Sequence, residues 1–477
     1  MAPLEQELKT DRFGKDMTEH PTGFIRRLWL SIFSEPIVPR TERDRKRFPF
    51  RYLVLHLRPA TVPEETLRFT LSWGLGGMAV ILVMLQLATG VLLKYAYEPV
   101  PAQAYASILR IQHEVLFGQF IRNIHHWSAN FLVLVIFLHL LRVFFTGAFH
   151  PPRQFNWVIG LCLLVLVLAS NFTGYLLPWD QLAYWGTTIC IGMLEYVPGI
   201  GTWLQNMIRG STEIGPDTLR IFFATHTAVL PLLIVTLIAF HSWRVRKAGG
   251  LVRQPSGEGK SNPEPVRVLT MPNLLLREVV VALALIASVF VLSALLDAPL
   301  GKPANPGLSP NPTKAPWYFS GIQEMLLHFH PSFAVFIVPL LFFGAFLLLP
   351  YVHYGATTGG VWFSTQRGRR TAAIAAGAAS LVTPAVIVLD EYVIDFPAWF
   401  PGLPLAVSNG LIPAVALLAV IIGLYLLMVR GFSASRFEAV QAAFVFLAAA
   451  FAFLTMTCVW FRGQGMKLVW PFQGTPL

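Results

Sequence analysis

Long apolar segments alternate with shorter polar ones along most of the chain. An apolar segment of about 20 residues can cross a bilayer as an α-helix, because each residue adds ~1.5 Å. Nine segments meet this length, at roughly 69–93, 125–147, 154–177, 225–243, 277–297, 333–352, 371–390, 409–429 and 437–460. The pattern therefore predicts an all-α, polytopic membrane protein with about nine transmembrane helices. Because the number of spans is odd, the start of the first span and the end of the last span lie on opposite sides of the membrane.

The composition agrees with this prediction. The chain has 477 residues, of which 55% are hydrophobic and 13% charged, and its mean hydropathy is +0.58. Soluble enzymes are far less apolar, so that class is excluded. The net charge of +11 lies between the apolar runs rather than along one arm or helix face, which excludes a nucleic-acid-binding protein. Cys162, Cys190 and Cys458 form no Cys-x-x-Cys motif, so neither a disulfide framework nor a zinc site is predicted.

The basic residues indicate the orientation of the chain. The N-terminal segment, the loops on the same side and the adjoining span ends carry 27 of the 36 Lys and Arg residues, and the other side carries nine. Cytoplasmic loops are enriched in Lys and Arg, so we expect a multi-pass protein of the inner (cytoplasmic) membrane with a cytoplasmic N-terminus. The cytoplasmic side is called the n-side and the outer side the p-side. The first residues are charged and contain no short apolar run, so no cleaved signal peptide is expected.

Two polar segments flank the first four spans. The N-terminal segment, 1–68, carries 13 basic and ten acidic side chains. Within it, residues 24–33 are mostly apolar and include the basic pair Arg26 and Arg27, which favours an amphipathic helix lying on the cytoplasmic membrane surface. An ordinary solvated helix in a small tail is the alternative. The second segment, 249–276, begins with Gly, Pro, Ser and Lys residues and is predicted to be a cytoplasmic linker.

Four histidines fall at related positions on two spans. His125 and His139 are fourteen residues apart, and His226 and His241 are fifteen apart. At 100° per residue each pair shares one helix face to within ~40–60°, about 21–23 Å apart along the axis. Both spans run from the p-side to the n-side, so His125 is expected level with His226, and His139 level with His241.

A lone histidine inside a membrane protein is usually a hydrogen-bonded core residue. Four at matched depths are harder to explain in that way, because ionisable side chains are costly there unless they pair or bind a ligand. We therefore predict a four-helix bundle with two bis-histidine haem sites stacked across the membrane. Since no Cys-x-x-Cys-His motif occurs, both haems would be bound non-covalently.

Glycines and arginines extend this prediction. Four glycines repeat the fourteen-residue spacing on the first and third spans: Gly76, Gly90, Gly160 and Gly174. Glycine lets a flat group such as a porphyrin approach the backbone, although close packing of helices through small residues is the alternative. Arg122 and Arg142 flank the two histidines of the second span and could neutralise haem propionates, or simply reach the interface.

Several motifs carry a resemblance to a known family. They are Arg122-Asn123-Ile124-His125-His126-Trp127-Ser128-Ala129, His139-Leu140-Leu141-Arg142, Thr173-Gly174-Tyr175-Leu176-Leu177-Pro178-Trp179-Asp180-Gln181 and Arg209-Gly210-Ser211. Together they resemble cytochrome b of the quinol–cytochrome c reductases. The fifteen-residue gap between His226 and His241 is closer to the form of photosynthetic membranes, in which the subunit is split in two. The resemblance covers about 60–355, whereas 371–460 match poorly.

The resemblance implies a Q-cycle subunit. In that family quinol is oxidised at a p-side pocket, one electron passes to a Rieske-type iron–sulfur protein and a c-type cytochrome, and the other crosses two b haems to reduce quinone on the n-side. It also implies a homodimer within a larger complex. Two alternatives are a dihaem membrane anchor of another reductase and a haem-free transporter. The absence of Asp, Glu, Lys and Arg near the span centres disfavours a transporter, and two aromatic p-side loops favour the Q-cycle subunit over the anchor.

Two positions depart from the family pattern. The family's quinol-oxidation motif is Pro-Glu-Trp-Tyr, and the matching residues here are Ala315-Pro316-Trp317-Tyr318. We therefore expect Trp317 and Tyr318 to line the quinol pocket and Glu324, with His328 and His330 nearby, to replace the missing proton acceptor. Glu324 as a structural hydrogen-bonding residue is the alternative. Such a change would suit a different quinol, such as menaquinol.

The second departure is Gly74, which stands where members of the split form attach a further haem through cysteine. The resulting division has five parts: the N-terminal segment 1–68, the dihaem domain 69–248, the linker 249–276, the quinol-site helices and p-side loop 277–355, and three additional C-terminal helices 356–477.

Overall fold

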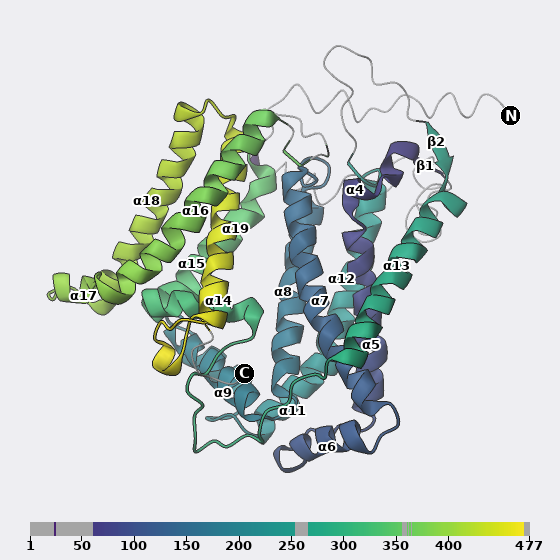
Figure 1. Cartoon of the computed structure of the whole chain (residues 1–477), viewed down its shortest axis with the longest axis vertical. Helices are drawn as coiled ribbons and strands as arrows, with labels where there is room; N and C mark the ends of the chain where they lie inside the picture. The colour runs from purple at the N-terminus through teal and green to yellow at the C-terminus, as the bar shows by residue number, and fades with distance from the viewer. Residues whose placement is uncertain are drawn as a thin grey trace.

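The computed structural model describes residues 23–24, 61–252, 266–354, 360, 362–363 and 365–471. Within them, nine helical segments are long and apolar enough to cross a membrane, so the predicted number of spans is confirmed (Figure 1). They are Leu75–Lys94, Gly118–Phe145, Gln154–Leu176, Pro216–Lys247, Leu276–Leu295, Phe333–Tyr351, Gln366–Tyr392, Val407–Gly431 and Arg436–Trp460. The expected surface helix at 24–33 lies almost wholly outside the described residues, and so does half of the linker.

The spans are built from long helices with short irregular turns at some of their ends. In the first half they are α5 (Leu75–Lys94), α7 (Gly118–Phe145), α8 (Gln154–Leu176), α11 (Pro216–Ala224) and α12 (Leu230–Lys247). In the second half they are α13 (Thr270–Leu295), α15 (Val338–Leu348), α16 (Gln366–Tyr392), α18 (Ile412–Leu426) and α19 (Arg436–Trp460). Within the described residues the one sheet pairs two three-residue strands, β1 (Thr61–Pro63) and β2 (Arg267–Leu269), in antiparallel register.

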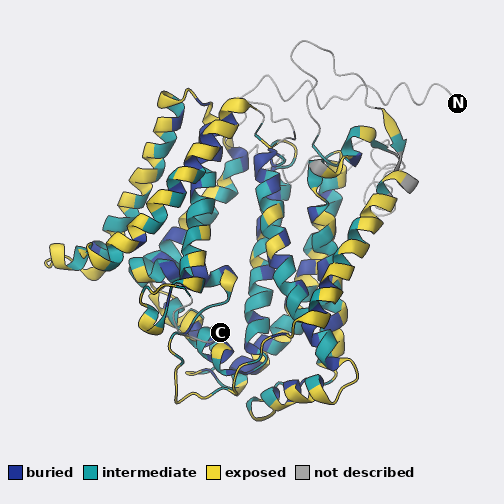
Figure 2. Cartoon of the chain, viewed as in Figure 1, coloured by how far each residue is buried: buried dark blue, intermediate teal, exposed yellow. Residues whose placement is uncertain are grey.

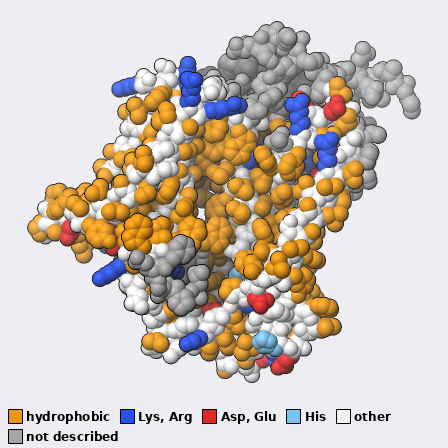
Figure 3. Space-filling model, viewed as in Figure 1, with side chains coloured by type: hydrophobic (Ala, Val, Ile, Leu, Met, Phe, Trp, Pro, Cys, Tyr) orange, Lys and Arg blue, Asp and Glu red, His pale blue; other side chains and the backbone are white. Residues whose placement is uncertain are grey.

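Shorter helices lie between the spans. They are α4 (Phe69–Ser72), α6 (Pro101–His113), α9 (Gln181–Gly192), α10 (Gly201–Arg209), α14 (Trp317–His328) and α17 (Phe396–Trp399). The strands and α4 lie at one end of the molecule, which we call the β1 end, and α6, α9 and α11 lie at the other, the α6 end (Figure 1). Lys and Arg side chains gather along the β1 end in the face shown in Figure 3.

The first span begins later than expected. Residues 69–93 were predicted to form one helix, but α4 ends at Ser72 and α5 starts at Leu75. Trp73 and Gly74 between them adopt left-handed backbone angles, with φ of 54° and 64°. A residue in this conformation ends an α-helix, and glycine adopts it without strain. Hydropathy alone does not register such a break, because both residues are compatible with an apolar run.

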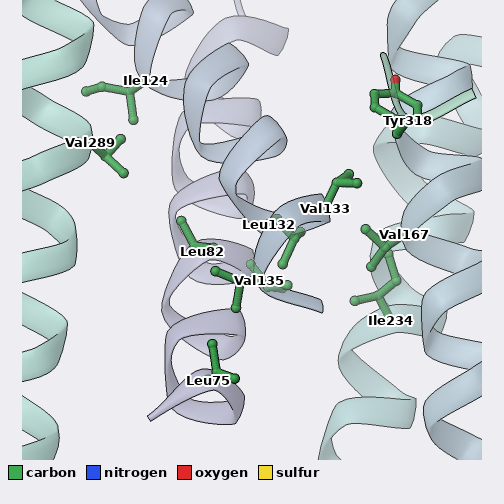
Figure 4. Packing of buried hydrophobic residues seen from close by; sticks show 11 residues of the cluster. Leu75, Leu82, Ile124, Leu132, Val133, Val135, Val167, Ile234, Val289 and Tyr318 are labelled. Carbon is green, nitrogen blue, oxygen red and sulfur yellow. The ribbon is translucent and has the colours of Figure 1, made fainter. Parts of the chain in front are cut away.

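The four spans α5, α7, α8 and α11–α12 form a bundle with an aliphatic core. Leu82, Val133, Val167 and Ile234 come from four different helices and are all buried in one cluster (Figure 4). Tyr318 of α14 joins the same cluster from outside the bundle. Many outward-facing side chains are large, apolar and exposed (Figure 2), as expected where lipid rather than water surrounds a helix.

The last three spans form a unit of their own. Helix α19 packs on α16 and on α14. The core of this unit is rich in alanine, including Ala375, Ala379, Ala439 and Ala442, which lets the helices approach closely. At the β1 end Phe437 of α19 packs with Phe144 of α7. The C-terminal unit is therefore attached to the bundle as well as to α14.

Candidate functional site

The four histidines form two close pairs. The ring centroids of His125 and His226 are 6.2 Å apart, and those of His139 and His241 are 6.5 Å apart. The rings in the two pairs are inclined by 77° and 74°. These are the pairs expected from the helix directions: the first lies toward the α6 end of α7, the second toward its β1 end.

The separation within each pair fits a single metal ion between two imidazoles. A metal–imidazole bond of about 2.0–2.1 Å plus roughly 1.1 Å from the nitrogen to the ring centroid, doubled, gives about 6.3 Å. The observed 6.2 and 6.5 Å lie on either side of this value. Directly hydrogen-bonded imidazoles would be closer together. Each pair could therefore hold a haem iron, with one imidazole nitrogen from each histidine.

An irregular turn accommodates the longer histidine spacing on the fourth span. His226 lies in a π-helical turn, Thr225–Val229, between α11 and α12. A π-turn contains one more residue than an α-turn, and such turns are frequent at functional sites. The extra residue offsets the difference between fifteen and fourteen, so His226 and His241 share one face as His125 and His139 do. The sequence shows the fifteen-residue spacing, but it did not predict the π-turn that compensates for the extra residue.

One turn of α5 positions His125. Gln86 donates from Nε2 to His125 O at 2.7 Å and to Ser128 Oγ at 2.6 Å, which fixes α7 against α5. Thr89 Oγ1 donates to Leu85 O and lies 2.9 Å from His125 Nδ1. The hydroxyl oxygen can therefore accept the Nδ1 proton, which leaves Nε2 free to bind a metal.

His226 is held in the same way by α8. Its Nδ1 lies 2.9 Å from Ser170 O and 3.3 Å from Thr173 Oγ1. The pair toward the β1 end differs, because Nδ1 of His139 and Nδ1 of His241 are buried without a hydrogen-bond partner among the described residues. The two pairs thus share a geometry but differ in the hydrogen bonds to their outer nitrogens.

Each of the four predicted glycines faces one histidine ring. A Cβ built on each would meet the Cε1 atom of the opposing imidazole, at 3.3 Å for Gly90 and His125, 3.5 Å for Gly76 and His139, 2.6 Å for Gly174 and His226, and 3.6 Å for Gly160 and His241. The sequence prediction assigned these glycines to the approach of a porphyrin. The structure adds that they make room for the imidazoles. Their assignment as haem-contacting residues stays a prediction.

The two flanking arginines donate to backbone carbonyls. Arg122 binds Ala298 O and Pro299 O, both at 2.7 Å, and so ties α7 to the loop after α13. Arg142 donates to Leu71 O from Nε and from a terminal nitrogen, at 3.1 and 2.8 Å. Both are buried. The contact with haem propionates expected for them stays a prediction, and their shown role is to fasten loops to α7.

The predicted quinol motif lies against the bundle near the His125–His226 pair. Trp317 Nε1 donates to Asn130 Oδ1 of α7 at 2.7 Å. Tyr318 is buried in the bundle core, and burial raises the pKa of its hydroxyl. Phe319 packs on Phe172 of α8, with centroids 6.3 Å apart. The start of α14 is therefore held between α7, which carries His125, and α8, which carries the hydrogen-bond partners of His226.

Glu324 faces the C-terminal unit rather than open space. Its side chain has no exposed surface and forms an ion pair with Arg462 at 2.7 Å. It also lies 3.3 Å from His328 Nε2, while His330 bonds to Ser332 instead. The sequence prediction named Glu324 and His328 but did not include Arg462, Asp390 or Glu391 in the site. A signal was present, because these charges all sit at span ends on the same side.

The chain was compared with known proteins. The family model described as cytochrome b/b6/petB matches residues 63–249. Cytochrome b6 of Heliobacterium modesticaldum is 41% identical over 188 residues, covering 39% of this chain and 87% of that protein. Cytochrome b6 of Desmonostoc sp. is 41% identical and that of Euglena gracilis 42% identical, each over 175 residues, 37% of this chain and 81% of theirs.

A solved structure extends the similarity beyond that region. A chain titled hyperthermophilic respiratory Complex III superposes with a TM-score of 0.59 and 21% sequence identity, covering 87% of this chain and 95% of that one. At this identity the match supports the fold alone.

Proposed function

Because this chain belongs to the cytochrome b/b6 family, we propose that it is the cytochrome b subunit of a quinol:cytochrome c (or related acceptor) oxidoreductase. Membership of this family makes it a multi-pass membrane protein of electron transport that binds b-type haem. The proposal adds that it binds two haems, oxidises quinol on the p-side and moves protons by a Q-cycle.

The observation that carries the proposal is the pair of imidazole separations. Each matches the gap needed for one bis-histidine iron, and the two lie on the same helices fourteen and fifteen residues apart. Held by two histidines, a haem would supply one-electron transfer rather than oxygen binding. His125 and His226 would hold one haem, and His139 and His241 the other. The chain's own contribution is to keep both imidazoles of each pair at a fixed distance and tautomer.

We assign the p-side to the α6 end. Trp317 and Tyr318 would line a quinol pocket beside the His125–His226 pair, supported by the bond from Trp317 to Asn130. Tyr318 keeps its proton, since burial raises its pKa, and can donate a hydrogen bond to a quinol oxygen. Quinone reduction would take place on the n-side near the other pair. We include in this proposal that the quinol is of another type, such as menaquinol.

The partner subunits, the oligomeric state and the location are proposed from the family. We propose a Rieske-type iron–sulfur protein and a c-type cytochrome as separate partner subunits, a homodimer within a larger complex, and an inner membrane location with the N-terminus on the cytoplasmic side. The accumulation of Lys and Arg at the β1 end supports that orientation. We also propose the division of the chain into five parts, with boundaries after residues 68, 248, 276 and 355. A dihaem anchor of another reductase is the second candidate, and it needs no pocket at Trp317.

The first test counts haems in the purified chain by pyridine haemochrome and titrates them by potential. Two non-covalent b haems with separate midpoints are expected. Replacing His125 or His226 should remove one haem and leave the other. His126→Ala is the matched control, since His126 is the neighbour of His125 and bonds instead to Asn130 of its own helix. A haem-free wild-type protein would overturn the proposal, and haem binding without quinol-dependent reduction would favour the anchor.

A further inference from the structure

A buried group of charges joins α14 to the C-terminal unit. Arg462, just after α19, contacts Glu324 through two nitrogens, with Nε 3.1 Å from both carboxylate oxygens and a terminal nitrogen 2.7 Å from one. Its other terminal nitrogen lies 2.7 Å from Glu391 of α16. The guanidinium has no exposed surface. An arginine buried in this way is stable only because both carboxylates neutralise it.

His328 connects the same group to a second carboxylate of α16. Its Nδ1 lies 2.6 Å from Asp390 Oδ2, and its Nε2 lies 3.3 Å from Glu324 Oε1. An imidazolium with each N–H directed at a carboxylate can give one proton to the carboxylate that this nitrogen faces, and it regains a proton when the bare nitrogen turns toward the other carboxylate. The ring therefore stands between two acceptors, as a proton carrier must.

The exposure of these side chains increases along the line. Glu324 is fully buried, His328 is 10% exposed and Asp390 is 22% exposed. Glu324 lies two turns along α14 from Trp317. The line thus leads from the helix that carries the quinol motif to the molecular surface at the end of α16.

The charges around His328 favour its protonated form. Burial opposes this, but the hydrogen bonds and charges of Asp390 and Glu324 prevail and raise the pKa of His328 to about 9. The pKa of Glu324 is lowered, since Arg462 and His328 outweigh its burial. Glu391 of α16 and Lys314, whose amino group donates to Val459 O at 2.9 Å, complete the charged groups described here, and Cys458 of α19 is the nearest thiol. At neutral pH Glu324 and His328 are therefore both charged.

The motif itself offers no carboxylate. Pro316 caps α14 without a side-chain hydrogen bond. Gln323 binds Ala315 N at 2.7 Å and Thr313 O at 2.7 Å, and so fixes the motif loop onto α14. The motif, Glu324 and His328 are therefore all held by one helix, α14.

We propose that Glu324, His328 and Asp390, held in place by Arg462, form the proton exit of the p-side quinol site. This inference rests on the proposed function. Oxidation of one quinol releases two electrons to one-electron acceptors, an iron–sulfur protein and a haem, and two protons. One of these protons binds Glu324, while His328 gives its Nδ1 proton to Asp390, which releases it to the p-side water. The ring of the now neutral His328 turns so that its bare Nδ1 faces Glu324, takes up the proton of Glu324 there and turns back, which restores the starting state, so one proton enters and one leaves. The second quinol proton follows the same route.

The test measures quinol-dependent haem reduction by the complete complex in native membranes, expressed per haem, between pH 6 and 9. Asp390→Asn should slow the rate about tenfold or more, with haem content unchanged. Added formate, a small weak acid that carries protons, should restore it. Asp395→Asn is the matched control: Asp395 only caps α17, which asparagine does equally well.

Each outcome decides the inference. A wild-type rate in Asp390→Asn overturns it, and so does a slow rate that formate does not restore, since that indicates a structural role. If Asp390→Asn fails to assemble, His328→Gln decides instead, because glutamine keeps a donor but cannot relay a proton, and a normal rate there overturns the inference. A wild-type complex that does not oxidise quinol refutes the proposed function itself.

Discussion

The imidazole of His226 lies directly against the α-carbon of Gly174. A Cβ at this position would come within 2.6 Å of the ring, closer than real atoms approach, and the ring is fixed by Ser170 and Thr173. Gly174→Ala should therefore displace His226 and remove the haem of the His125–His226 pair. The check is the haem count of the purified variant, expected to fall from two to one.

Gly160→Ala is the matched comparison. The equivalent Cβ would lie 3.6 Å from His241, an ordinary van der Waals contact. This variant should keep both haems, with a small loss of stability at most. Equal haem loss in the two alanine variants would contradict the contacts described here.

The hydrogen bond from His125 to Thr89 should tune one haem selectively. When Thr89 Oγ1 accepts a hydrogen bond from His125 Nδ1–H, the imidazole becomes a stronger electron donor, and this would stabilise ferric iron. Thr89→Val keeps the shape but removes the acceptor, so the midpoint potential of the haem at His125 should rise. A potentiometric titration of both haems checks this, and an equal change at the His139–His241 haem would be inconsistent with it.

Stability should decrease at alkaline pH through His328. Its pKa is raised from 6.5 to about 9 in the folded protein, so its contribution is complete below pH 6.5 and is lost as the pH rises through 9. The Tm of the detergent-solubilised protein between pH 7 and 10 measures this loss. His328→Gln should be less stable at pH 7 and should lack this part of the decline. Parallel curves for the two proteins would count against the assignment.

The ion pair of Arg462 and Glu324 should show strong coupling. Arg462→Met leaves a buried carboxylate without its partner and is expected to cost about 3–5 kcal/mol. Adding Glu324→Gln to the same chain should recover part of this loss, because the neutral amide needs no cation. A double-mutant cycle on unfolding free energies measures the coupling, and additive effects would show that the pair does not interact.

Much of the fold and of the histidine site could be predicted from the sequence. The length of the apolar segments was enough to predict the nine spans. The spacing of the four histidines, together with the direction of their two spans, was enough to predict which rings meet. Both features are local or periodic, so they can be recognised without knowing how the helices pack. The glycine spacing likewise indicated which faces of α5 and α8 point inward.

Other features depend on contacts between distant parts of the chain. Nothing near Arg462 in the sequence indicates that it binds Glu324, and its partner on α16, Glu391, lies 71 residues earlier in the chain. The break at Trp73 and Gly74 escaped prediction for another reason: it depends on backbone angles, which hydropathy does not encode. The π-turn at Thr225–Val229 escaped in the same way.

The pairing of Glu324 with Arg462 also bears on how the protein is made. Arg462 follows Glu324 by 138 residues, so α14 leaves the ribosome long before its cation exists. A lone ionised carboxylate cannot be buried cheaply, and until α19 is inserted Glu324 must stay hydrated or carry a proton. We therefore expect this face of α14 to close late in biogenesis, after the C-terminal helices have entered the membrane.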